Sequence, residues 1–284
     1  MSDIAAPRAR LSAGLPPAPR LNLGAAQRLL AGVIVTLIYV FLLTPIVIVV
    51  AASFNPSQSN ALPTGGLSLR WYRDFAGSDG FVNAFKFSLQ LGLVAAIAAT
   101  AIGLVTAYGI VRFLGRRRAL GQAFALMPMM IPHILISLSL LLMLTQIAIP
   151  ESAVLLVGHV MICLPFTVAG IIASLEGVDP QLELAAWTLG ASRWRILWEI
   201  TIPLVAPGLV SSLLFAFIVS FGDVYISLFL SSPGKTTLPI EIFTFMLWDS
   251  SPVIAAITTV QMLMIIALGL AIERLVGLRK VMRL

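Results

Sequence analysis

A few side chains with acid–base or ligand chemistry stand inside long apolar runs of the sequence: His133, His159, Cys163 and Asp223. Imidazole, thiolate and carboxylate groups can move protons, hold metal ions or pair with a cation. Neither histidine has a second ligand at the short spacing that metal sites use, and a single cysteine cannot form an intrachain disulfide. We therefore expect two packing histidines, a buried apolar cysteine and no metal site.

Asp223 is the most informative of these groups, because it interrupts the apolar segment SFGDVYISLF. A carboxylate inside a membrane costs about 2.5–3.5 kcal/mol on insertion scales, so such residues usually face a bundle interior or a wet cavity. Two interpretations stay open: Asp223 lines a translocation path, or it makes a structural hydrogen bond or gate contact. Phe221 and Tyr225 flank it as further candidate path residues, and Gly222 permits a local distortion.

The segment PGKTT, Pro233–Thr237, contains the Gly-Lys-Thr of a phosphate-binding loop without the rest of its pattern. That pattern requires a glycine five residues before Gly234, and this chain has Phe229 there. We expect a turn, and we expect no nucleotide or other cofactor to be bound by this chain. The sequence also lacks a recognisable catalytic triad, so it predicts a protein that is not itself an enzyme.

The elements that carry these residues must cross a membrane. The 284 residues are 59% hydrophobic and only 11% charged, with a mean hydropathy of +1.02, whereas soluble domains usually carry about 25% charged residues. Six segments reach the roughly 20 apolar residues that a membrane-spanning helix needs. They are Leu29–Ser53, Phe85–Val111, Leu120–Ile147, Ser152–Ser174, Leu204–Leu230 and Val253–Ile272. None alternates like an outer-membrane strand, so the predicted fold class is an all-α integral membrane protein with six transmembrane helices.

Lysine and arginine predict the orientation of these spans, because they concentrate in cytoplasmic connections. One set of connections holds Arg8, Arg10, Arg20, Arg28, Arg112, Arg116, Arg117, Arg118, Arg193, Arg195, Arg274, Arg279, Lys280 and Arg283. The other set holds only Arg70, Arg73, Lys86 and Lys235. Both termini are therefore predicted to be cytoplasmic, with tails at 1–28 and 273–284 around a six-span domain at 29–272. The net charge of +6 follows from this topology and does not indicate nucleic-acid binding.

Two short patterns predict how the spans are packed and bent. Ala95, Ala99, Gly103 and Ala107 recur every four residues, which puts them on one helix face where another backbone can approach closely. Prolines at 128, 132 and 165 remove backbone donors inside the third and fourth spans, so we expect bends there.

The loop between the first two spans contains LRWYRDF. We expect a short interfacial helix here, with Trp71, Tyr72 and Phe75 at headgroup level. A direct contact with an external partner is the alternative.

The connection between the fourth and fifth spans, at about 176–203, predicts two short helices with a tight bend. Asp179 is a good N-cap and Pro180 suits the first helical position, so Gln181–Leu189 should be helical and Gly190 should end it. Ser192 can cap a second helix that runs to Pro203. Ala185 and Ala186 leave one patch of the first helix nearly bare. The residues alone leave open whether this loop lies on lipid, through its tryptophans, or docks against a protein.

The same loop resembles the "EAA" loop of the inner-membrane permease subunits of ABC importers. That pattern is Glu-Ala-Ala, three residues, Gly, nine residues, Ile, one residue, Leu-Pro. It is matched at the right spacing by Ala185, Ala186, Gly190, Ile200 and Pro203. Leu184 stands at the position of the Glu, Ile202 stands at that of the Leu, and Glu183 lies one residue before the Glu position.

The resemblance covers most of the chain. FVNAFKFSLQLGLVAAIAATAIGLVTAYGIVR is similar to the family's second span, and SFGDVYISLFLSSPGKTTLPIEIF is similar to a segment of its spermidine/putrescine, PotC-like subgroup. The resemblance implies a type I importer permease with a MetI-like fold in the bacterial inner membrane. It also implies two ATPase subunits, a second permease subunit that is a homologue or a second copy, and a periplasmic binding protein. ATP and Mg²⁺ would bind to the ATPase subunits, and Gln181–Gly190 would be the helix seated in an ATPase.

For the substrate, the subgroup favours a polyamine such as putrescine or spermidine, or a related small cationic metabolite. An aminophosphonate, an amino-acid conjugate or ferric iron are alternatives within the same importer class. A stand-alone secondary transporter is the rival class, but it requires coupling-ion chemistry within the spans and often two similar halves. Neither is found in this sequence.

Overall fold

A computed structural model describes residues 24–59, 61–232, 234–249 and 251–276 of the chain. Within these residues the secondary structure is helical, and only an isolated bridge joins Ser232 to Lys235. The α-helices are α1 (Ala25–Ala52), α2 (Arg70–Gly77), α3 (Asp79–Phe113), α4 (Arg118–Leu126), α5 (His133–Gln146), α6 (Glu151–Glu176), α7 (Pro180–Thr188), α8 (Arg193–Ile196), α9 (Ile202–Phe221), α10 (Tyr225–Leu230), α11 (Leu238–Trp248) and α12 (Val253–Val276). Short 3₁₀ segments cover Gly115–Arg117 and Met127–Met130, and a π-helical segment covers Leu197–Thr201.

Five helical segments in the described residues are long and apolar enough to cross a membrane, and a bent helix pair makes a sixth. When the bent pair is counted as one span, the number equals the six spans that the sequence predicts. The two predicted terminal tails fall largely on residues 1–23 and 277–284, which lie outside the described part of the chain. α1 up to Ile48 forms a unit of its own, and it is apolar along its length, as expected of a membrane-spanning helix.

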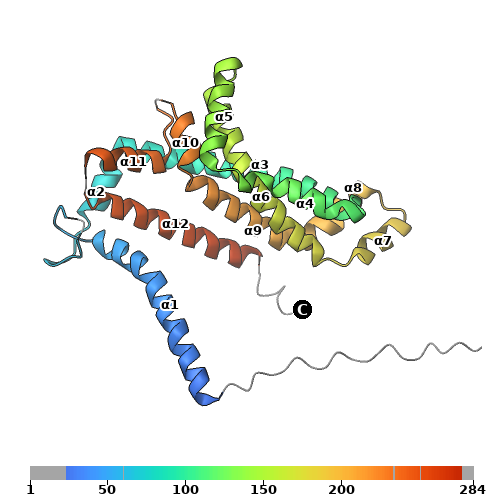
Figure 1. The fold of residues 1–284 in the computed structure, drawn as a ribbon, viewed down its shortest axis with the longest axis horizontal. Helices are drawn as coiled ribbons and strands as arrows, with labels where there is room; N and C mark the ends of the chain where they lie inside the picture. Colours follow the sequence, from blue (N-terminus) through green and yellow to red (C-terminus); the bar gives the residue numbers. More distant parts are fainter. Residues whose placement is uncertain (1–23, 60, 233, 250, 277–284) are drawn as a thin grey trace, which may run out of the picture. The chain divides into compact units, whose positions relative to one another are not determined.

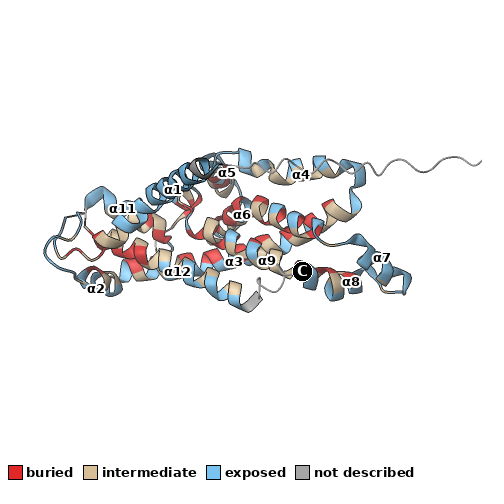
Figure 2. Ribbon diagram, turned by 90° about the horizontal axis from the view of Figure 1, so that it is seen from below, coloured by how far each residue is buried: buried red, intermediate tan, exposed pale blue. Residues whose placement is uncertain are grey.

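The core of the second unit, Val49 onward, is built by α3, α6 and α9, which pack against one another. Figure 2 shows buried residues concentrated on these three helices, whereas α7 is largely exposed. α2 and α11 lie at one end of this bundle, and α7 and α8 lie at the other (Figure 1). We call these the α2 end and the α7 end.

The predicted small-residue face of α3 is confirmed as a packing face, and its neighbour is α6 of the same chain. Ala95, Ala99 and Ala107 are fully buried. A Cβ atom placed on Gly103 would lie 2.5 Å from Thr167 Oγ1, and the Thr167 hydroxyl donates a hydrogen bond of 3.0 Å to the Ala99 carbonyl. The two backbones can approach this closely only because the residues between them are small.

The third predicted span is not one bent helix, as Leu120–Ile147 implied, but two helical segments at 84° to each other. The break lies between Met130 and His133, where Ile131 is extended, with φ −88° and ψ 125°. The ring of Pro132 disfavours the helical conformation for the residue before it, and Pro132 has no N–H for the helical ladder. By contrast, Pro165 is accommodated within the continuous helix α6.

The fifth predicted span, Leu204–Leu230, is also interrupted. α9 ends at Phe221, and α10 begins separately at Tyr225. The Asp223 carboxylate accepts a hydrogen bond of 2.8 Å from the Ile226 N–H, so it satisfies a free donor in the first turn of α10. α11, which follows the turn at Lys235, is a further helix that the sequence pattern does not predict.

α2 forms where the LRWYRDF pattern predicts a helix, and Trp71 is buried within the protein. Trp71 is only 4% exposed, and its Nε1 donates a hydrogen bond of 2.6 Å to the Asn55 carbonyl. Tyr72 is half-buried, and its hydroxyl lies 2.7 Å from Ser53 Oγ. The Asn55 carbonyl offers the indole a partner inside the protein, which a linear reading of the sequence does not show.

The close approach of α3 to α6 can be tested with two glycines of the same helix. Gly103→Ala should lower the free energy of unfolding by about 1–3 kcal/mol, because the added methyl group overpacks the contact with Thr167. Gly109→Ala is the control, since a Cβ there meets no atom within 4 Å. Thermal unfolding of the purified protein in detergent measures both, and equal midpoints for the two variants would contradict the packing account.

Candidate functional site

α7 forms for the local reasons that the sequence predicts. The Asp179 carboxylate accepts a hydrogen bond of 2.9 Å from the Gln181 N–H, and Pro180 occupies the first turn. The helix ends at Thr188, and Gly190 follows with a φ of +87°, a conformation that costs little energy only for glycine. The helix therefore begins and ends within one residue of the predicted bounds.

The second half of the loop differs from the prediction. Ser192 caps the next helix, accepting a bond of 3.3 Å from the Arg195 N–H, but that helix does not end at Pro203. It passes through the π-helical segment Leu197–Thr201 directly into α9. Pro203 has no N–H and its ring crowds the preceding turn, and a local widening of the helix is a common way to accommodate such a residue. α8 is thus a rigid extension of a membrane span.

α7 has two different faces, because successive helical residues are rotated by about 100°. One face carries Glu183, Leu184 and Trp187 and borders a hollow of about 350 Å³. The other carries Leu182, Ala185 and Ala186, with Leu189 just beyond the helix end. The hollow is completed by the end of α3 and by α8, which contribute Tyr108, Arg112, Phe113, Arg193 and Ile196.

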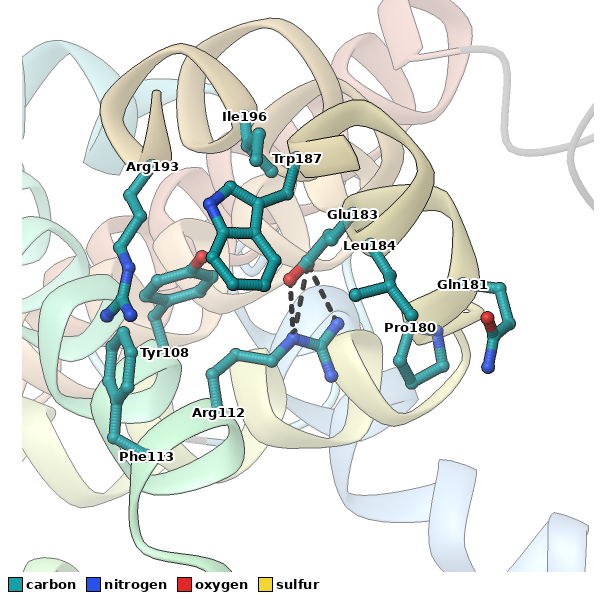
Figure 3. Close-up of a pocket in the computed structure, with 10 residues that line it drawn as sticks. All are labelled: Tyr108, Arg112, Phe113, Pro180, Gln181, Glu183, Leu184, Trp187, Arg193 and Ile196. Carbon is teal, nitrogen blue, oxygen red and sulfur yellow. Dashed lines mark hydrogen bonds and ion pairs between the residues drawn. The ribbon is translucent and has the colours of Figure 1, made fainter. Parts of the chain in front are cut away.

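Two residues hold Glu183 beside this hollow, and Figure 3 shows the first of them, Arg112. Arg112, at the end of α3, donates from Nε at 3.1 and 3.0 Å to the two carboxylate oxygens and from Nη2 at 2.9 Å. The Thr201 hydroxyl donates a fourth hydrogen bond, of 3.0 Å, to Oε1 of the same carboxylate. The Arg112 and Glu183 side chains are only 14% and 13% exposed. The sequence pattern includes Glu183 but does not indicate its partners Arg112 and Thr201, because they lie 71 and 18 positions away in the chain.

The remaining residues of the predicted loop lie on or near the opposite face. Ala186, Gly190 and Ile200 border a second hollow with Arg195 and Glu199. Leu189 is 88% exposed and Leu182 is 48% exposed. Ala185 is also exposed, and Pro203 is exposed in the first turn of α9. The short side chains of the two alanines therefore leave this face of α7 open to the approach of another surface.

Asp223 lies at the end of α9 remote from α7 and is buried. Its Oδ1 is 3.5 Å from Nδ1 of His133, and the His133 ring meets Tyr225 edge-on at 6.5 Å between centroids. The three residues come together where both broken spans are interrupted. Tyr225 is 54% exposed, whereas Phe221 is buried in the core against Phe85. No spacing in the sequence indicates the pairing of His133 with Asp223, because it requires the two helix breaks to lie together in space.

His159 and the PGKTT segment have the structural roles that the sequence predicts. His159 is fully buried, and its ring nitrogens lie 2.7 Å from Ser220 Oγ and 3.1 Å from Ser227 Oγ, so it is a satisfied packing histidine. The PGKTT segment forms a turn in which the Lys235 N–H bonds to the Ser232 carbonyl at 2.9 Å; Pro233 lies outside the described residues. No group of three potential metal ligands occurs among the described residues.

Known proteins similar to this chain are transport subunits. A family described as "Binding-protein-dependent transport system inner membrane component" matches residues 99–279. The spermidine/putrescine transport system permease protein PotC of Escherichia coli K12 is 31% identical over 86% of this chain and 92% of its own length. The putrescine transport system permease protein PotI of the same strain is 34% identical over 80% and 83%.

Solved structures agree on the fold. A chain of the bacterial alginate ABC transporter, in complex with an alginate pentasaccharide-bound periplasmic protein, aligns with a TM-score of 0.65 at 17% identity, over 87% of this chain and 93% of its own. The family's transport systems depend on a binding protein, and its members are transport components rather than enzymes. The chain therefore belongs to the inner-membrane components of binding-protein-dependent transport systems, as an inner-membrane permease subunit of an importer with the MetI-like fold.

Proposed function

We propose that this chain forms half of the translocation path of an ATP-driven importer for a polyamine or a related small cationic metabolite. Relatives named for spermidine and putrescine transport, at 31% and 34% identity over most of the chain, support the substrate class. Two ATPase subunits bind ATP and Mg²⁺, a second permease subunit completes the path, and a periplasmic protein delivers the substrate.

The observation that carries this proposal is the two-faced geometry of α7. One face is fixed to its own chain through Glu183, and the other presents Leu182, Ala185 and Leu189 to the surroundings. A short capped helix of this kind fits a cleft in a partner, because small side chains allow close approach. We assign this face to the ATPase, which resolves the choice between lipid and protein that the residues alone leave open.

The charge distribution supports an orientation in which α7 and both termini are cytoplasmic. Arg112, Arg116, Arg117, Arg193 and Arg195 all lie at the α7 end, and positive charge accumulates on the cytoplasmic side. ATP binding closes the ATPase subunits and displaces the docked helices. The permease subunits then rock between inward- and outward-facing states, which is alternating access driven by a ligand that binds one state better.

The cation path is assigned to Asp223 and Tyr225, with His133 as a third member. Asp223 places a carboxylate at the junction of two broken helices, and interrupted helices are common at transporter binding sites. Tyr225 is exposed there and offers an aromatic face to an ammonium group. Phe221 supports the junction from within the core rather than facing the path in this conformation.

We call the face of α7 that carries Leu182, Ala185 and Ala186 the docking face. A charged side chain on this face should weaken binding of the ATPase. Ala186→Asp buries an unpaired carboxylate in the contact, which we expect to weaken docking by about 3–5 kcal/mol. ATPase co-purification and substrate-stimulated ATP hydrolysis should both fall, while the subunit still inserts in the membrane. Ala76→Asp, on the exposed surface of α2 at the other end, is the control. Normal ATPase recovery with Ala186→Asp would refute the assignment of this face.

Spermidine uptake should depend more on the negative charge of Asp223 than on the hydrogen bond that its carboxylate accepts. Asp223→Asn keeps an acceptor for the Ile226 N–H but removes the negative charge, so spermidine uptake should fall about tenfold or more, the equivalent of one charged contact of about 1.5–3 kcal/mol. Glu151→Gln, at the exposed start of α6, should leave uptake unchanged.

Calorimetric titration of the cognate binding protein with spermidine, putrescine and an aminophosphonate identifies the substrate class independently. Preference for the aminophosphonate would overturn the polyamine assignment.

A further inference from the structure

Glu183 is the charged residue of α7, and the "EAA" pattern leaves it without a role. It lies one position before Leu184, which occupies the site of the glutamate in the "EAA" pattern. On a helix, one position is a rotation of about 100°. A carboxylate at 183 therefore points away from the face that carries Ala185 and Leu182, and Figure 3 shows it directed at the end of α3.

The contacts of Glu183 join three elements at one carboxylate. Arg112 approaches from the last turn of α3, and Thr201 approaches from the π-helical segment that leads into α9. A guanidinium that engages a carboxylate through two nitrogens fixes orientation as well as distance. Thr201 is fully buried, and the ion pair is mostly sheltered from solvent, so salt screens it less than a surface pair.

The two helices reached through Glu183 extend to the opposite end of the bundle. α3 contains 35 residues, which corresponds to about 52 Å at 1.5 Å per residue. Near its far end, Phe85 packs edge-on against Phe221 at 5.8 Å. α9 ends at that same Phe221, two residues before Asp223. A displacement of α7 that is conveyed to the ends of α3 and α9 therefore reaches the junction that holds Asp223.

We propose that Glu183, through Arg112 and Thr201, is an internal anchor that makes α7 move as one body with α3 and α9, rather than a contact to the ATPase. The proposal rests on the proposed function and assigns the roles of its coupling loop. Leu184 borders the hollow beside the anchor and does not lie on the face that we assign to the ATPase. Docking therefore does not require a carboxylate at that position. Arg112 and Thr201 are positioning residues, since they act through α7 and touch neither substrate nor nucleotide.

The anchor predicts a defect in coupling that is distinct from a defect in docking. In Glu183→Gln and Arg112→Ala the ATPase still finds its docking face, so it should co-purify at the wild-type level and hydrolyse ATP. The movement of α7 is no longer conveyed to the spans. Spermidine transported per ATP hydrolysed should then fall about tenfold, within the range typical of coupling between sites.

Two further variants separate anchoring from simple stability. Glu176→Gln breaks another ion pair between a helix end and an arginine, that of Glu176 with Arg118, which does not involve α7; it should leave the transport-to-hydrolysis ratio unchanged. The exchange Arg112→Glu with Glu183→Arg restores opposite charges, and the Thr201 hydroxyl can accept from the new arginine. It should recover at least half of the lost coupling.

The experiment uses the complete importer, with its ATPase, second permease subunit and binding protein, reconstituted in liposomes. Spin labels introduced by Gln181→Cys and Val105→Cys report the distance between α7 and α3. The anchor predicts a narrow distance distribution that broadens in Glu183→Gln but not in Glu176→Gln. An unchanged transport ratio and distribution in Glu183→Gln would overturn the anchor. Failure of the wild-type chain to recover an ATPase would instead overturn the proposed function.

Discussion

The contact between α3 and α6 is the constraint on which the rest of the bundle depends. Thr167 lies against Gly103 and donates its hydroxyl proton to the Ala99 carbonyl, so the two backbones are in near contact at the middle of the bundle. In a membrane, apolar burial against another helix gains little over burial in lipid, and close packing with interhelical hydrogen bonds holds helices together. With α3 and α6 fixed, α9 packs against both, and the polar groups at both ends of the bundle acquire their neighbours.

The two interrupted spans bring polar side chains together at one place, and the backbone groups freed by the breaks find hydrogen-bond partners there. Backbone that is not helical is tolerated at membrane depth only where its polar groups are satisfied within the protein or face water. Asp223 accepts from the Ile226 N–H, and Ser137 of α5 donates to the Ile226 carbonyl at 3.0 Å. The break that follows α9 is thus tied to the helix that follows the other break. This arrangement explains why a carboxylate, a histidine and a tyrosine meet there.

The loop of α7 shows how a surface segment can be rigid without being buried. Asp179, Ser192 and Gly190 determine where its helices start and stop through local hydrogen bonds and a positive φ. Glu183 then fixes its orientation through the ion pair with Arg112. The opposite face remains exposed, which is the property that a docking helix needs. Rigidity and exposure are therefore supplied by different faces of the same nine residues.

The sequence by itself determined the features that depend on composition and on neighbouring residues. Apolar length predicted the six spans, four-residue spacing predicted the packing face of α3, and capping residues predicted the bounds of α7 nearly to the residue. These features are local, because hydrophobicity, capping and backbone conformation depend on groups only a few positions apart.

Only the tertiary structure decided which distant groups meet. The severity of the break at Pro132, the burial of Trp71 and the continuity of α8 with α9 depend on what packs against each segment. The pairings of Glu183 with Arg112 and of Asp223 with His133 join residues far apart in the chain. No residue spacing encodes such pairs. They form because the packed helices α3, α6 and α9 hold their ends in fixed positions, and a charged group held there needs a partner within reach of a hydrogen bond.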